Sequence, residues 1–130
     1  MGLFDKFKTQ KKQPLETLAI QHLHHSDSFR GFKRIKLVNH GDADAQRNIK
    51  KLLGKGISEV TVTVKVDNNN FTEPVRFIDV AADGLHVGTF YEHDPNEYID
   101  KIIHGSVDAA HIKLEDACDR YYSTLFIHIQ

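Results

Sequence analysis

The chain contains a single cysteine, Cys118, among its 130 residues. One cysteine cannot form a disulfide within the chain, so the fold has to be stable without one. No segment has the features of a secretory signal, and these two absences together lead us to expect a cytoplasmic protein. No apolar run approaches the length that a membrane-spanning helix needs, so we also expect no stable membrane insertion.

An excess of charge of either sign is also missing, since the formal net charge is -1 and the sequence pI is about 6.7. This balance argues against sequence-independent binding along duplex nucleic acid, which depends on many phosphate contacts. It leaves room for a small local site. The hydrophobic content of 40% and charged content of 27% are typical of a soluble globular protein.

Patterns typical of catalysis are absent, and we therefore expect neither an enzyme nor a cofactor. Cys118 lies among acidic residues, which disfavour a reactive thiolate. The Gly-Lys-Gly turn at residues 54–56 is too short for a phosphate-binding loop. His22, His24 and His25 form the one histidine cluster, but zinc needs three or four ligands at suitable spacing. We expect no metal site, and the sequence leaves the role of these three histidines open.

The most regular part of the chain runs from Val60 to Phe90. Val60, Val62, Val64 and Val66 alternate with polar residues, which predicts a strand with one buried face. Residues 75–80 and 85–90 predict two further strands, with a tight turn at residues 82–84. Three consecutive strands with short connections predict an antiparallel meander.

Further strands and two helices are expected on either side of this meander. Strands are predicted at residues 29–38, 107–114 and 121–129. Helices are predicted after Asp42 or Asp44, either of which can act as an N-cap, and after Asp94, where Pro95 and Glu97 complete a capping pattern. The apolar sides of the two helices comprise Ile49, Leu52 and Leu53, and Tyr98, Ile99, Ile102 and Ile103.

This order predicts an α+β fold, a small, strongly bent β-sheet or partly closed barrel of about six strands with two helices packed against it. We place the folded domain at residues 29–130. Residues 1–28 are predicted to be an N-terminal extension. Residues 1–14 of this extension are basic and form either an amphipathic helix or a frayed end, and residues 15–25 predict a short helix.

Three stretches in the middle of the chain resemble the HIRAN domain in the form found in bacterial proteins. They are NHGDADAQR at residues 39–47 before a helix, NNNFTEPV at 68–75 after the valine strand, and GLHVGTF at 84–90. The family typically has Asn-Pro-aromatic-Asp in the second stretch, where this chain has Asn69, Asn70, Phe71 and Thr72. The resemblance implies a small β-barrel that binds single-stranded DNA, including free 3′ ends.

If the resemblance extends to function, Phe71 stacks on a terminal base and Phe90 forms the opposite wall. Asn69 and Thr72 contact base edges or the sugar, and Thr89 stands where the family often has a polar residue. The basic residues expected to meet phosphates are Arg34, Lys36 and Arg47. The alternative interpretation is that residues 68–70 make only a turn, that Phe71 closes one end of the barrel, and that these cations are solvated surface residues.

A second functional hypothesis comes from another class. The same barrel could serve as a protein-interaction or assembly module that binds no nucleic acid. In this hypothesis the closing strand Tyr121–Ile129 lies at the edge of the sheet and pairs with a protein partner or with a second copy in a homodimer. Local positive potential around residues 34–47 would favour nucleic-acid binding over assembly.

Overall fold

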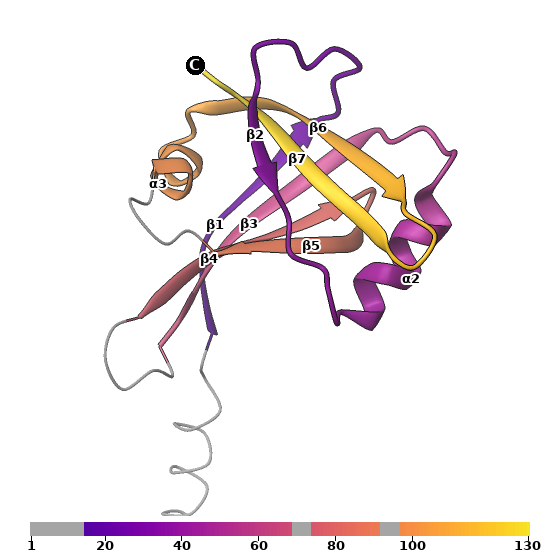
Figure 1. Cartoon of the computed structure of the whole chain (residues 1–130). Coiled ribbons are helices and arrows are strands. Elements are labelled where there is room, and N and C mark those ends of the chain that lie inside the picture. Colours follow the sequence, from indigo (N-terminus) through magenta and orange to yellow (C-terminus); the bar gives the residue numbers. More distant parts are fainter. Residues whose placement is uncertain (1–14, 69–73, 92–96) are drawn as a thin grey trace, which may run out of the picture.

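The computed structural model describes residues 15–68, 74–91 and 97–130 (Figure 1). These residues form seven strands and two helices. In chain order they are β1 (Leu15–His24), β2 (Lys33–Lys36), α2 (Ala43–Leu52), β3 (Glu59–Asp67), β4 (Val75–Ala82), β5 (Leu85–Tyr91), α3 (Glu97–Ile103), β6 (Val107–Asp116) and β7 (Tyr121–Ile129). The basic segment 1–14, the loop residues Asn69, Phe71 and Thr72, and the helix start at Asp94 lie outside the described residues.

The strands form two antiparallel sheets, with β2 and β7 crossing in front of the four-stranded sheet in Figure 1. One sheet has the order β1-β3-β4-β5 and the other has the order β2-β7-β6. Two isolated bridges connect their edges, His25 to Ala110 and Val38 to Thr89. The α+β class and the two helices are confirmed, while the described residues show seven strands and no closed barrel.

The predicted meander is confirmed as β3, β4 and β5. The alternating valines of β3 are buried, with Val60, Val62 and Val64 fully shielded from solvent. The turn between β4 and β5 places Asp83 and Gly84 at φ angles of 47° and 83°. The carboxylate of Asp83 accepts the backbone N–H groups of Ser58 and Glu59, which offsets the cost of this left-handed conformation.

The hydrophobic core lies between the two sheets, and each helix contributes one apolar side to it. In α2, the Asp42 side chain accepts the Ala45 N–H as an N-cap, while Ile49 and Leu52 are buried. In α3, Ile99 and Ile102 are fully buried. Figure 1 places the two helices on opposite sides of the sheets. No helix in the described parts of the chain has the length and apolar character needed to cross a membrane.

The short helix predicted at residues 15–25 is wrong, because residues 15–24 form β1 and pair with β3. The spacing of Leu15, Leu18 and Leu23 suggested a helix, yet Leu15 and Leu18 are exposed and only Leu23 is buried. The register shifts between Thr17 and Ala19, so Leu18 is an extra residue that interrupts the alternation expected of a strand. Residues 15–24 are therefore an integral strand of the four-stranded sheet and not an extension before the fold.

The prediction that Tyr121–Ile129 is an edge strand is also wrong. β7 lies between β2 and β6 and pairs with both, so it is a central strand of its sheet. The strand expected at residues 29–38 is shorter, since β2 covers only Lys33–Lys36. The strand predicted at residues 121–129 is confirmed, and its alternate residues Ser123, Leu125 and Ile127 are buried.

Candidate functional site

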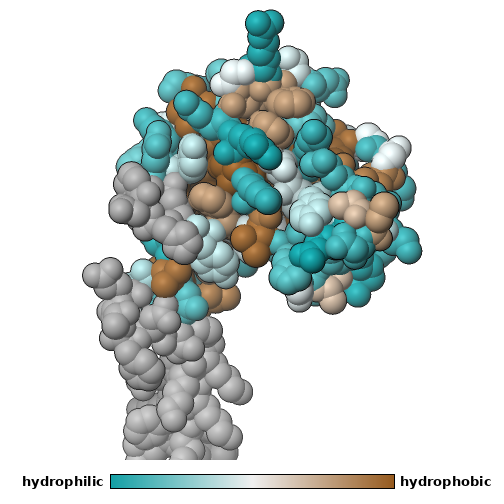
Figure 2. All heavy atoms as spheres, in the orientation of Figure 1, coloured by the Kyte–Doolittle hydropathy of each residue, from teal (hydrophilic) through white to brown (hydrophobic). Residues whose placement is uncertain are grey.

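The outer face of the three-stranded sheet carries aromatic and basic side chains together. Ile35, Leu125 and Ile127 point into the core, so the residues that alternate with them point outward. We define the outer face by Arg34 and Lys36 of β2, His111 and Lys113 of β6, and Tyr122, Thr124, Phe126 and His128 of β7. Figure 2, in the same orientation as Figure 1, shows hydrophilic and hydrophobic side chains interleaved on this side of the molecule.

The strand register sets these side chains in rows across the sheet. In one row, Lys36 of β2 and Lys113 of β6 lie on either side of Thr124 of β7, which is buried. Arg34, Phe126 and His111 form the next row. Basic residues of β2 and β6 therefore flank the central strand β7 on both sides. Neighbouring strands lie about 4.8 Å apart, and residues i and i+2 of one strand lie about 6.7 Å apart.

A cavity of about 390 Å³ lies at one end of the outer face. Its walls are residues 36–40, which lead from β2 toward α2, together with Arg120 and Tyr122. Arg120 Nη1 donates a hydrogen bond to His40 Nδ1 across 2.5 Å. Lys36 and His40 are exposed, while Arg120 and Tyr122 are half-buried, so both cations and an aromatic ring are accessible. A second cavity of about 270 Å³ shares His40 and Arg120 as walls.

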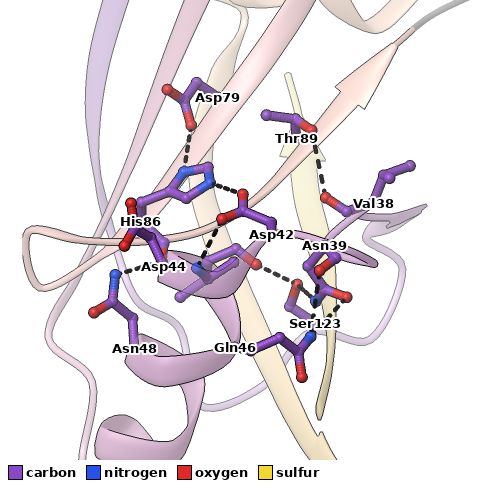
Figure 3. Close-up of polar contacts among 12 residues, drawn as sticks. Val38, Asn39, Asp42, Asp44, Gln46, Asn48, Asp79, His86, Thr89 and Ser123 are labelled. Atoms are coloured by element: carbon purple, nitrogen blue, oxygen red, sulfur yellow. Dashed lines mark hydrogen bonds and ion pairs between the residues drawn. The ribbon is translucent and has the colours of Figure 1, made fainter. Parts of the chain in front are cut away.

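The cavity wall at residues 37–39 is fixed by contacts to three other elements (Figure 3). The Val38 N–H donates to the Thr89 carbonyl at 2.7 Å, and the Thr89 N–H donates to the Val38 carbonyl at 3.0 Å. The buried Asn39 amide donates to Ser123 Oγ at 2.9 Å. Gln46 of α2 joins β7 by donating to the Tyr121 carbonyl at 2.9 Å and accepting the Tyr121 N–H at 2.8 Å. The wall is therefore held in place before any ligand binds.

His86 links the start of α2 to the four-stranded sheet, and Figure 3 shows its ring between two carboxylates. Nε2 lies 2.7 Å from Asp42 Oδ2, and Nδ1 lies 2.7 Å from Asp79 Oδ1. Lys65 Nζ donates to the other oxygen of Asp79 at 3.1 Å. The hydrogen bond to Asp79 raises the pKa of His86 most strongly, burial opposes it, and Asp42 adds to it, giving a pKa of about 9. His86 is thus a cation at neutral pH.

The pKa values of Asp42 and Asp79 are lowered, the opposite direction to that of His86. Burial alone would raise the pKa of Asp79, but the hydrogen bonds from His86 and Lys65 outweigh it and hold this pKa below 3.8. Burial likewise opposes the bonds from the Ala45 N–H and His86 at Asp42, and its pKa also lies below 3.8. All these charges are paired within the fold, so the cluster stabilises the loop before α2.

The structure brings together some of the residues predicted for nucleic-acid binding. Lys36 lines the cavity, Arg34 lies next along the same face of β2, and Thr89 supports the cavity wall through Val38. Arg47 lies instead on the exposed side of α2, where it pairs with Asp44.

Phe90 packs against the core, with its ring 6.2 Å from that of Tyr98, and is not part of the outer face. Asn69, Phe71 and Thr72 lie outside the described residues, so the pocket predicted around Phe71 stays a prediction.

Three cavity residues were not anticipated from the sequence: His40, Arg120 and Tyr122. The alternation of β7 does place Tyr122 on the face opposite the buried residues, and this signal could have identified it. His40 and Arg120 are 80 positions apart, and their contact depends on how β2 pairs with β7. Periodicity does not encode that pairing.

The histidines offer no alternative metal site in the part of the chain that the structure describes. His22 belongs to strand β1 and His25 directly follows it, so the extended backbone does not bring the two rings together as a helix would. His22 Nδ1 lies 3.3 Å from Glu59 on the exposed surface. Among the described residues, no group of three or more His, Cys, Asp or Glu side chains could hold a metal ion.

Another cavity, of about 330 Å³, lies beyond the C-terminal end of α2. Its walls are mixed, with Leu53, Ile57, Ile112 and Leu114 beside His25, Asp27 and Lys55. Its one lysine, Lys55, shares the cavity with the carboxylate of Asp27, whereas Lys36 and Arg120 line the cavity at Tyr122 together with a tyrosine ring.

Comparison of the chain with protein-family models, with curated proteins and with solved structures gives no match. The functional argument therefore depends on the side chains themselves and on their arrangement over the three-stranded sheet.

Proposed function

We propose that the protein binds single-stranded nucleic acid on the outer face of the three-stranded sheet, with one nucleotide in the cavity beside Tyr122. The observation that carries this proposal is the meeting of one aromatic ring with two cations, Lys36 and Arg120, in a cavity of about 390 Å³. A base can stack on the ring while a phosphate contacts the cations, which are the two contacts that single strands require.

The spacing along β2 supports the same function. Arg34 and Lys36 are two residues apart on one face, about 6.7 Å by strand geometry, which suits successive phosphates of an extended strand. Lys113 lies across β7 from Lys36 and adds a third cation. Stacking does not depend on which base is present, so we expect weak sequence preference.

A duplex fits this surface less well. Paired bases keep their faces stacked inside the helix and cannot use Tyr122. The protein's net charge of -1 also gives no general attraction to the many phosphates of a duplex. The local cations favour a short, unpaired segment.

The proposal agrees with the resemblance to HIRAN domains, whose barrels bind single-stranded DNA. We further propose that the two sheets act as a partly closed barrel of this kind, joined by the bridges at His25 and Val38.

Fluorescence anisotropy with labelled single-stranded DNA at two salt concentrations tests the function. Tyr122→Ala is expected to weaken binding about tenfold, within the usual 1–3 kcal/mol of a base–aromatic stack, while Tyr122→Phe keeps most of the affinity. Lys36→Gln is expected to reduce the dependence of log affinity on log salt by about one unit, because one phosphate contact is lost. Lys50→Gln, an exposed change in the last turn of α2, is the matched charge control.

Comparing free with phosphate-blocked 3′ ends then shows whether the cavity takes a terminus or an internal nucleotide. If Lys36→Gln and Lys50→Gln lose the same affinity and Tyr122→Ala has no effect, the protein attracts nucleic acid only through diffuse charge. That result would contradict binding of a nucleotide in the cavity beside Tyr122. Absence of binding at low salt would overturn the proposed function.

A further inference from the structure

We propose that residues 25–32 form a pH-sensitive strap over the outer face, in which the stacked rings of His25 and His111 hold Phe29 on Phe126 until acidification releases it. The inference rests on the proposed function, because Phe29 occupies a place where a second base could stack. The segment connects β1 to β2 at the end of the sheet remote from α2 (Figure 1).

Ring contacts define the closed strap. Phe29 stacks on His111 with centroids 4.2 Å apart and an interplanar angle of 22°, and it packs on Phe126 at 4.5 Å. His25 stacks on the same His111 at 4.7 Å and 28°. His111 Nδ1 donates to the Ser26 carbonyl at 2.7 Å, which ties the strap backbone to β6. Phe29 thus lies against outer-face rings much as a nucleobase would.

The closed geometry favours neutral His25. Its Nε2 faces the Ile112 carbonyl at 3.5 Å and is the nitrogen placed to carry the hydrogen. Its Nδ1 is buried and has no hydrogen-bond partner within the described structure. Protonation would put a second N–H on this buried atom without an acceptor and would place a positive charge against the stacked His111 ring, so it disfavours the closed strap.

The charges around His25 are few and come from four segments. Asp27 of the strap and Asp83 of the β4–β5 turn favour the protonated form, while His111 of β6 opposes it. Lys55, after α2, lines the same cavity as His25. Burial is the largest influence and lowers the pKa of His25 below 6.5, with the Ile112 carbonyl acting in the opposite direction. The closed strap therefore loses stability as the pH falls below about 6.5, the ordinary histidine value.

Opening the strap would lengthen the binding face. Tyr122 and Phe126 are four residues apart on β7, about 13 Å by strand geometry, so an open strap would let a strand run from the cavity to a second stacking position. Arg34, opposite Phe126, would lie beside this added segment. The closed form is expected to bind short ligands at the cavity alone.

A tryptophan reporter tests the strap without nucleic acid. The chain has no tryptophan, so Phe29→Trp gives a single fluorophore at the strap. Its emission is expected to shift to longer wavelength between pH 7.5 and 5, with unchanged far-ultraviolet circular dichroism. His25→Gln in the same background is expected to remove most of this shift, because glutamine does not titrate. An emission spectrum that is constant over this range while the protein stays folded would overturn the proposal.

A binding comparison at pH 7.5 tests the ligand side. Phe29→Ala is expected to bind a six-nucleotide oligomer about fivefold more tightly than the wild type and a dinucleotide equally well. Ile20→Ala is the control, because Ile20 is an exposed apolar side chain of β1 outside both the strap and the outer face. Equal affinities of Phe29→Ala and wild type for the hexamer would overturn the strap as a cover of the face. If Phe29→Trp shows the expected emission shift but neither oligomer binds, the strap is supported and the proposed function is overturned. The second stacking position would then be overturned as well.

Discussion

Replacing Gly88 by alanine is expected to lower the free energy of unfolding by about 3 kcal/mol, the upper end of the usual cost of overpacking. A Cβ at this position would lie 2.9 Å from Leu37 Cβ, 3.1 Å from Ser123 Oγ and 3.3 Å from the Val38 carbonyl oxygen. None of these atoms can swing away, since two are at or next to the backbone and Ser123 Oγ is engaged with Asn39 and the Val87 carbonyl.

The same change is expected to weaken nucleotide binding, because Leu37 and Val38 form part of the cavity wall. Thermal unfolding should show a decrease of about 10 °C in Tm for a domain of this size. Gly56→Ala is the matched control, as no atom lies within 4 Å of its added Cβ and its φ is not in the left-handed region. A Gly88→Ala protein as stable as Gly56→Ala would show that the two sheets are not as close at β5 as the structure has them.

Local patterns predicted most of the individual elements. The valines of β3 carry a period of two that only a half-buried strand satisfies, and the predicted meander is confirmed. Of the two N-cap candidates, Asp42 and Asp44, the structure shows Asp42 in that role. β1 was missed because Leu18 is an extra residue that breaks the alternation, so the remaining leucines fall at helical spacing. Its strand conformation comes from pairing with β3, a tertiary contact that overrides local preference.

Local sequence patterns do not determine which strands pair with one another. β7 has the apolar alternation of a strong strand, and as the last element it was expected at an edge. Its position between β2 and β6 depends on contacts to residues 33–36, more than 80 positions earlier. The strand sequence specifies which side is buried but not which neighbours supply the hydrogen bonds.

The same limit applies to the candidate site. Arg34 and Lys36 could be assigned to one outward face of a strand, as they are. Arg47 shares their charge, but its helix turns it toward Asp44. Arg120 and Tyr122 join Lys36 only because β7 runs antiparallel to β2 in this register, so the cavity is a property of the pairing and not of any single segment.

The stability of the protein is expected to fall by about 1–2 kcal/mol as the pH rises from 6.5 to 9.5, because His86 then loses its proton. The pKa of His86 rises from 6.5 to about 9 in the folded protein, chiefly through Asp79. A raised folded-state pKa gives stability that is complete below pH 6.5 and lost as the pH passes about 9. The side chain is 30% exposed, so solvent screening keeps the effect below the full value of the shift.

Urea unfolding at a series of pH values measures this dependence, with His86→Gln as the test variant. Glutamine can donate to one carboxylate but carries no charge, so the variant should be less stable at pH 7 and should lose the decline between pH 6.5 and 9.5. His22→Gln, in an exposed pair with Glu59, is the matched control and should follow the wild-type curve. If the free energy of unfolding depends on pH in the same way in wild type and His86→Gln, the charge of His86 does not stabilise the fold.

The free energy of unfolding at acidic pH tests the contribution of Asp42 and Asp79. The pKa values of Asp42 and Asp79 lie below 3.8 in the folded protein, so their contribution is present above that pH and is lost as the pH falls further. In His86→Gln this acidic decline should also become shallower, because the partner that lowers both pKa values is gone. If His86, Asp42 and Asp79 act together, His86→Gln alone should weaken the pH dependence of the free energy of unfolding at both alkaline and acidic pH. Independent surface charges would not change both parts of the curve through one substitution.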